Sequence, residues 1–272
     1  MHYKDIDWNR LWQEARRRKS WKKKGRSDWD RRAPGFAKRN IDSSYAERFL
    51  QLVKPEPHWR VLDIGSGPGT LALPLAARVQ AVTALDFSAA MLAELESRAA
   101  RQGITNITAI QASWTDDWRQ LGIAEHEVVI SSRSLSVVDL KSALEKMHGW
   151  ATEKVFIADR VGSGPFDPEL FAAVGRPFEP GPDFIFTVNL LYQLGIHPKI
   201  DYIEIDQSRT FATREDAVES CRWMLDELTP AEEAGLAAYV DERLEQSEGG
   251  TYTLRRSSRV KWALLSWEKG TV

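Results

Sequence analysis

Two aspartates and a cluster of glycines are the residues of this sequence whose types and spacing favour binding chemistry. Gly65, Gly67 and Gly69 alternate within VLDIGSGPGTLALPLA, and Asp63 precedes the first of them by two positions. Asp86 ends the next apolar run, AVTALD. Glycines let a ligand approach the backbone closely, and an acid that ends the following strand can accept hydrogen bonds from ribose hydroxyls. The pattern therefore predicts a site for a nucleoside.

The spacing of the glycines argues against a dinucleotide. The dinucleotide fingerprint is G-x-G-x-x-G, whereas Thr70 stands here where its third glycine would be. Asp63 would repel a pyrophosphate but would suit a ligand that carries an ammonium group. Phe87 and Met91 follow Asp86 closely enough to flank an adenine ring. The expected ligand has a ribose, a purine and a cationic amino-acid end, and it has no pyrophosphate.

S-adenosylmethionine (SAM) has these parts, and the sequence resembles the class I SAM-dependent methyltransferases. The resemblance rests on VLDIGSGPGT, LDFSAAML, AIQASW and EVVISS as the first four motifs, and it runs from about residue 45 to residue 267. It implies that SAM is the methyl donor. It also implies a doubly wound α/β fold with a mostly parallel seven-stranded sheet, an antiparallel last strand and added N-terminal helices. The implied cofactor-binding residues are Trp29, Asp63, Gly65, Ser66, Gly67, Gly69, Asp86, Phe87, Met91, Ser113, Trp114 and Ser131.

The elements that must position these residues follow from the alternation of apolar runs with helical patterns. WRVLDI, AVTALD, ITNITAIQ, HEVVIS and KVFIAD are predicted strands, with helices in most of the segments between them. Such alternation is typical of βαβ units, in which helices cover both faces of a parallel sheet. KIDYIEID and SRVKWALLSW are the expected sixth and seventh strands. A capping box of Thr229 and Glu232, with Pro230 between them, predicts the start of a late helix.

The N-terminal segment is expected to be a separate cap. Residues 1–44 are predicted to be helical and basic, residues 45–272 to form the methyltransferase domain, and residues 161–200 to form a substrate lid within it. The helix predicted over Asp5–Ala15 is amphipathic, with Trp8, Leu11, Trp12 and Ala15 on one face. A further helix is expected over Ser43–Val53.

Residues 16–32 concentrate positive charge. They hold ten Lys or Arg and two Asp, whereas the formal net charge of the whole chain is −2. Interleaved with Trp21 and Trp29, these cations could bind RNA phosphates and stack on bases. A solvated helix surface is the simpler interpretation, and the acidic remainder of the chain would repel a long polyanion.

The predicted chemistry is the in-line transfer of a methyl group from a sulfonium, which requires positioning and the exclusion of water. SSRS follows the fourth strand, where enzymes that methylate adenine or cytosine amino groups carry Asp/Asn-Pro-Pro-aromatic. Enzymes that methylate cytosine C5 use a Pro-Cys nucleophile, whereas the single cysteine, Cys221, is expected in a helix core. The tentative substrate-binding residues are Arg133, Arg160, Tyr192 and His197, and no catalytic base is assigned.

Composition sets the remaining expectations. Hydrophobic residues make up 43% of the chain, there is no apolar run long enough to span a bilayer, and no metal-ligand spacing is evident. We expect a cytoplasmic SAM-dependent methyltransferase that acts on a small molecule. The alternatives are an RNA methyltransferase that uses the basic segment and a non-catalytic SAM-binding module. A nicotinamide-dependent oxidoreductase is the least favoured, because its glycine spacing differs.

Overall fold

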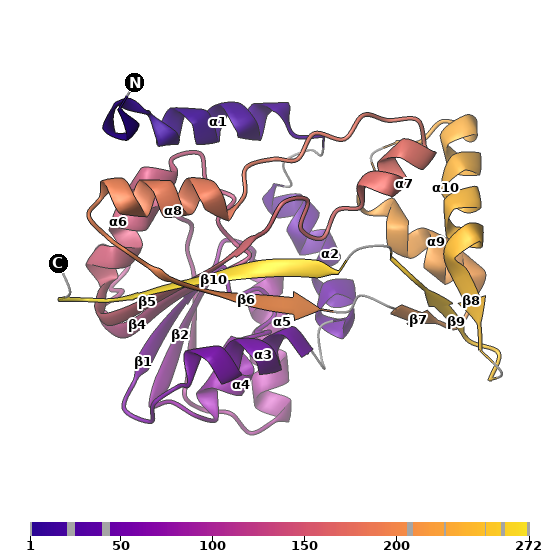
Figure 1. Ribbon diagram of the computed structural model, residues 1–272. Coiled ribbons are helices and arrows are strands. Elements are labelled where there is room, and N and C mark those ends of the chain that lie inside the picture. Colours follow the sequence, from indigo (N-terminus) through magenta and orange to yellow (C-terminus); the bar gives the residue numbers. More distant parts are fainter. Residues whose placement is uncertain are drawn as a thin grey trace.

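A seven-stranded sheet forms the centre of the molecule (Figure 1). The computed structural model describes residues 2–20, 25–39, 44–205, 209–225, 227–247, 249–256 and 259–270. The strand order is β3-β2-β1-β4-β5-β10-β6, and β10 runs antiparallel to both of its neighbours. The strands are β1 (Arg60–Ile64), β2 (Ala81–Asp86), β3 (Ile107–Gln111), β4 (His126–Ser132), β5 (Ala151–Arg160), β6 (Lys199–Ile205) and β10 (Val260–Glu268). The predicted fold class is confirmed.

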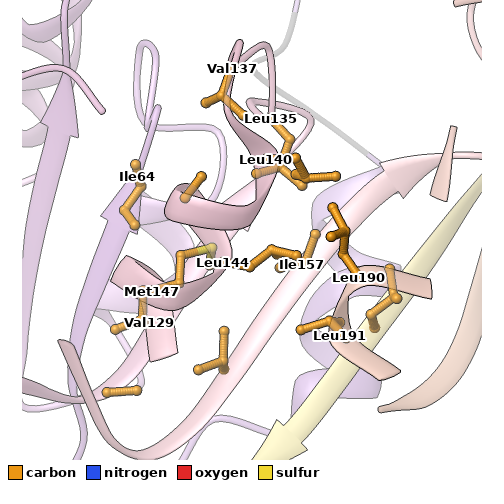
Figure 2. Close-up of a cluster of buried hydrophobic side chains, with 14 of the residues drawn as sticks. Ile64, Val129, Leu135, Val137, Leu140, Leu144, Met147, Ile157, Leu190 and Leu191 are labelled. Atoms are coloured by element: carbon orange, nitrogen blue, oxygen red, sulfur yellow. The ribbon is translucent and has the colours of Figure 1, made fainter. Parts of the chain in front are cut away.

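Neighbouring positions of β1 point to opposite faces of the sheet, and each face carries its own core. Leu62 belongs to a cluster of buried side chains that includes residues of α6 and α8. Figure 2 shows part of this cluster, with Leu144, Met147 and Leu190 among the labelled side chains. Val61 belongs to a second cluster with α3 and α4. The helices that cover the sheet are α3 (Ser44–Val53), α4 (Ala72–Ala76), α5 (Ala89–Arg101), α6 (Leu140–Trp150) and α8 (Phe184–Gln193). Because both faces are covered, the inner parallel strands β1 and β4 are buried on both faces through their central residues, as the sequence indicates.

The N-terminal helix α1 (Trp8–Arg18) packs against α6 and α8, and Figure 1 shows it lying over α8. Trp12 is buried and its indole Nε1 donates to the carbonyl of Val137 at 3.0 Å. Leu11, which the helical pattern places on the buried face, is instead 38% exposed. The predicted helix is present, but the indole of Trp12, rather than the whole apolar stripe, makes the deep contact.

The second N-terminal helix, α2 (Arg26–Arg39), packs against α5. In the sequence, Ser27 and Asp30 have the spacing of a capping box, which would begin the helix near Ser27. Instead, the helix begins at Arg26, and the Asp28 carboxylate accepts from the Gly25 amide at 2.9 Å. Asp30 does not cap α2, and its carboxylate contacts the start of α5.

A smaller unit, which was not predicted from the sequence, has its own hydrophobic core. It comprises α7 (Pro168–Ala173), α9 (Arg214–Arg222), α10 (Pro230–Arg243) and a sheet of β7 (Arg209–Phe211), β8 (Leu244–Gln246) and β9 (Tyr252–Leu254). The capping box of Thr229 and Glu232 is present at the start of α10. Cys221 is buried in this core, as predicted. No helix in the described residues is long and apolar enough to cross a membrane.

Candidate functional site

The glycine loop between β1 and α4 folds back onto the end of β2. Gly65, Gly67 and Gly69 adopt φ angles of +72°, +55° and +84°, which side-chain-bearing residues rarely adopt. The amides of Gly65 and Ser66 both donate to the carbonyl of Leu85, at 2.7 and 2.9 Å. The loop is therefore fixed beside Asp86, the residue that follows Leu85.

The three glycines are needed for different reasons. A Cβ at Gly65 would lie 2.4 Å from the Cβ of Ser134, and one at Gly69 would lie 3.0 Å from Cγ of Leu73. A Cβ at Gly67 would meet nothing within 4 Å. Gly65 and Gly69 thus allow close packing of the protein on itself, whereas Gly67 borders open space that a ligand can enter.

Replacing Gly65 with alanine is expected to destabilise the protein by roughly 2–3 kcal/mol, since the new Cβ overlaps Ser134 and the residue retains a left-handed conformation. The measurement is urea unfolding followed by circular dichroism. Gly103→Ala is the matched control, because Gly103 also has a positive φ of +67° but has open space around its Cβ position. Equal losses for both variants would contradict the packing argument.

Asp86 lies at the mouth of the loop and ties it to α5. Its Oδ2 accepts from the Gly67 amide and its Oδ1 from the Ser88 amide, both at 2.9 Å. Burial raises the pKa of Asp86, and the backbone hydrogen bonds oppose that shift. Each carboxylate oxygen has a second lone pair, so the side chain can accept further hydrogen bonds from vicinal hydroxyls.

Asp63 is buried below the loop, and it is only 2% exposed. Burial, together with the nearby charge of Asp86, raises the pKa of Asp63 to about 7. Within the described residues, Asp63 Oδ2, Ser66 Oγ and Thr70 Oγ1 are buried without a hydrogen-bond partner. Unpartnered polar atoms are rare in protein interiors, and three around one loop indicate a polar ligand. An ammonium group beside Asp63 would satisfy one of them.

The end of β3 lies beside the turn that follows Asp86. Gln111 donates from Nε2 to the carbonyl of Phe87 at 3.2 Å, which brings Ser113 and Trp114 to this edge. The Ser113 hydroxyl is within hydrogen-bonding distance of Thr115 Oγ1, at 3.0 Å. Phe87, Ser113 and Trp114 are partly buried. Their contact with an adenine remains a prediction.

Two other predicted cofactor-binding residues are buried in the protein. Met91 lies within α5, and its amide donates to the N-cap Ser88 at 3.2 Å. Ser131 is the penultimate residue of β4, and its hydroxyl lies 2.7 Å from that of Ser134, which in turn donates to the carbonyl of Ile64 at 2.6 Å. Ser131 therefore supports the loop from the side of β4.

Asp30 on α2 is a site residue that sequence reasoning missed. Its Oδ1 accepts from the hydroxyl of Ser88 at 2.5 Å and from the Ala90 amide at 3.4 Å, at the start of α5. This places α2, with the partly buried Trp29, directly beside the Asp86 turn. Asp30 contacts the N-terminus of a helix that is distant in the sequence, and no local spacing of residues predicts such a contact.

Arg98 is a second missed residue. Although it is buried on α5, its Nη1 donates to the carbonyl of Pro68 in the glycine loop at 2.7 Å. Burial lowers the pKa of Arg98, yet a guanidinium stays charged at neutral pH. Arg98 therefore positions the loop from below.

The four tentative substrate-binding residues divide into two groups. Arg133 and Arg160 lie at the carboxyl ends of β4 and β5, the edge to which the glycine loop belongs. Tyr192 lies in the last turn of α8, and His197 lies between α8 and β6. Because β6 runs parallel to β5, both residues lie toward the amino ends of these strands. The structure does not bring these two residues to the glycine loop, because α8 carries the chain back across the sheet.

Comparison with known proteins gives one family match. Residues 61–153 match the family described as a methyltransferase domain. The chain is 33% identical over 245 residues to an uncharacterised protein of Haemophilus influenzae, and the match covers 88% of each.

The chain also has more distant similarities. An 89-residue stretch is 32% identical to the 23S rRNA (uracil(1939)-C(5))-methyltransferase RlmD of Photobacterium angustum, and it covers 33% of this chain and 40% of that protein. The structure of a putative methyltransferase from Bacillus halodurans superposes with a TM-score of 0.57 at 15% identity, over 84% of this chain and all of that one. At that identity the likeness extends to the fold.

Proposed function

Because the chain belongs to the class I SAM-dependent methyltransferases, we propose that it transfers the methyl group of SAM to a small-molecule acceptor. One observation carries the assignment of the donor site. Open space at Gly67 adjoins the Asp86 carboxylate, and the unpartnered Asp63 Oδ2 is buried beside the same loop. These features suit a ligand with a ribose and an ammonium group.

The residues present fit SAM. Asp86 would accept from the ribose hydroxyls and Asp63 from the methionine ammonium, while Phe87 and Trp114 would border the adenine. When bound, SAM supplies a methyl group that is already activated by the positive charge on sulfur. The protein's contribution is to orient both reactants and to exclude water. No side chain in this account is required as a general base.

The proposed substrate class rests on a proposed cover over the site, which is formed by the segments that follow α1 and β5. The residues after α1 are tied to the segment between α7 and α8, because the Ser20 amide donates to the Glu179 carbonyl and the Glu179 amide to Ser20 Oγ, at 3.1 and 2.6 Å. Arg160 donates to the carbonyl of Pro182 in that same segment. A site closed by both segments suits a small acceptor better than a long polymer.

We therefore propose that residues 1–44 form the cap and that the lid comprises residues 161–183, a shorter segment than the 161–200 expected from the sequence. The narrowing follows from α8, whose Leu190 and Leu191 are buried in the main core. A helix that forms part of the core is poorly suited to open with substrate.

Replacing Asp30 with alanine tests the cap. We expect the dissociation rate of S-adenosylhomocysteine (SAH), the demethylated product of SAM, to rise roughly tenfold, since one charge-assisted hydrogen bond contributes about 1.5 kcal/mol. Stopped-flow fluorescence measures this rate. Asp28→Ala is the matched control, because Asp28 lies on the same helix and accepts from Gly25 and Arg31. An equal effect of both changes would show that helix stability matters rather than the contact with Ser88.

RNA remains the alternative acceptor, and the partial match to an rRNA methyltransferase is the observation that favours it. Part of the basic segment, residues 21–24, lies outside the described residues. The only cysteine, Cys221, is buried in the smaller unit and offers no nucleophile at the glycine loop. RNA binding that weakens with salt and with neutralisation of Arg16–Arg18 would favour RNA.

The proposed function is tested by incubating the protein with SAM and a metabolite extract, and by searching by mass spectrometry for compounds that gain one methyl group. Methylation of a small molecule, absent with Asp86→Asn, is the expected result. Methylation confined to added total RNA would contradict the proposed substrate class. Binding of SAH without transfer to any metabolite or RNA would instead favour a non-catalytic module.

A further inference from the structure

Arg133 holds a strained position at the carboxyl end of β4. Its φ is +59°, a left-handed conformation that costs a side-chain-bearing residue about 1–2 kcal/mol. The strain is maintained by its amide, which donates to the carbonyl of Ala158 on β5 at 2.8 Å. The next residue, Ser134, touches the glycine loop through its bond to Ile64. Strain of this kind is typical of functional positions.

Two aromatic rings hold the Arg133 side chain in place. Its guanidinium carbon lies 4.1 Å from the ring centroid of Tyr45 and 5.7 Å from that of Trp262. The two rings meet edge to face, with centroids 6.3 Å apart. Such stacking orients a guanidinium and leaves its N–H groups able to donate outward.

The cluster offers mainly hydrogen-bond donors. Among the described residues, the indole Nε1 of Trp262 is buried without a partner. The Tyr45 hydroxyl is 2.6 Å from Ser132 Oγ. Burial raises the pKa of Tyr45, and the charge of Asp63 adds a smaller contribution of the same sign. An indole N–H and an unpaired guanidinium together call for an acceptor with negative charge.

Carboxylates and guanidinium groups both lie at this edge of the sheet, and Asp86 and Asp159 are buried acids among them. Within the described residues neither Arg133 nor Arg16 has a carboxylate at ion-pair distance. Burial lowers the pKa of Arg160, and the charge of the partly buried Arg16 adds to that shift, so these two guanidinium groups lie near each other. Arg160 itself is engaged by the Pro182 carbonyl and faces the charges of Asp159 and Asp183. Of Arg16 and Arg133, the two cations named here without an ion-pair partner among the described residues, Arg133 is the exposed one, and it adjoins Ser134, which contacts the glycine loop.

We propose that Arg133, stacked on Tyr45 and Trp262, binds a carboxylate or phosphate group of the methyl acceptor. The proposal deepens the proposed function and rests on it, because it assigns the acceptor to the acidic small molecules. An arginine fork matches the two oxygens of either group, which explains why the position carries arginine despite the strained backbone.

The test is a thermal-unfolding titration of the SAH-loaded protein with inorganic phosphate or glutarate, at ionic strength held constant with sodium chloride. We expect the melting temperature to rise saturably for the wild type and not for Arg133→Gln. Arg119→Gln is the matched control, because Arg119 is an exposed arginine 5.5 Å from the Trp150 ring. A rise that does not saturate, or one that survives Arg133→Gln, would overturn the proposal.

A second measurement separates the acceptor from the donor, which also carries a carboxylate. By isothermal titration calorimetry, Arg133→Gln is expected to keep its SAH affinity within about threefold of the wild type. Two results together would overturn the proposal by assigning the anion site to the carboxylate of the donor. These are a fall in SAH affinity of more than about tenfold in Arg133→Gln, and a rise in melting temperature with anion that occurs only without SAH. If the wild type binds no SAH, the proposed function fails, and the anion titration without SAH still decides the role of Arg133.

Discussion

Replacing Asp86 with asparagine is expected to lower the affinity for SAH at least 100-fold. Asp86 would accept hydrogen bonds from two ribose hydroxyls, and each bond to a charged group contributes about 1.5–3 kcal/mol. The substitution also turns an amide N–H₂ toward the Gly67 or Ser88 amide, both of which now donate to the carboxylate. Isothermal titration calorimetry gives the dissociation constants of the two proteins.

Asp117→Asn controls for the loss of a carboxylate that accepts from backbone amides. Asp117 Oδ1 accepts from the amides of Arg119 and Gln120, away from the glycine loop. We expect its SAH affinity to stay at the wild-type value. If Asp86→Asn bound SAH as tightly as the wild type while remaining folded, the ribose would have to bind elsewhere.

The ligand-free protein is expected to lose stability as the pH rises from about 4 to 7. Asp63 has its pKa raised from 3.8 to about 7, so over this interval the unfolded chain releases a proton that the folded protein retains. The free energy of unfolding should therefore fall by on the order of 4 kcal/mol from this group alone. Urea unfolding at a series of pH values measures the change.

Asp63→Asn should remove the contribution of this group to the pH dependence and also weaken SAH binding. Asp159, whose pKa is raised to about 6 by burial, leaves a smaller dependence of the same sign in the variant. In the wild type, SAH should bind more tightly as the pH rises through 7, because its ammonium pairs with the ionised form of Asp63. An unchanged pH profile in Asp63→Asn would show that this carboxylate is ionised throughout.

The sequence predicts the central sheet well because each strand is an apolar run of the length that a covered parallel sheet requires. The motif around Gly65 and Asp86 is equally predictable, since the conformations and hydrogen bonds of these residues involve only neighbouring segments of the chain. The role of Asp63 follows from its burial, which its place within an apolar strand already indicates.

Long-range contacts account for what the sequence does not reveal. Asp30 and Arg98 act on residues 58 and 30 positions away, so neither has a local signature. The smaller unit arises because α7 packs with α9 and α10, which lie much later in the chain. Tyr192 and His197 were predicted beside the substrate from their place after strand five, and the direction of α8 carries them away.

A crystal structure of the protein with SAH tests the central claim most directly. The account predicts ribose hydroxyls within hydrogen-bonding distance of Asp86, the ammonium group beside Asp63 Oδ2, and ligand atoms packed against Gly67. SAH bound with its ribose away from Asp86, or a glycine loop that stays empty at saturating SAH, would contradict it.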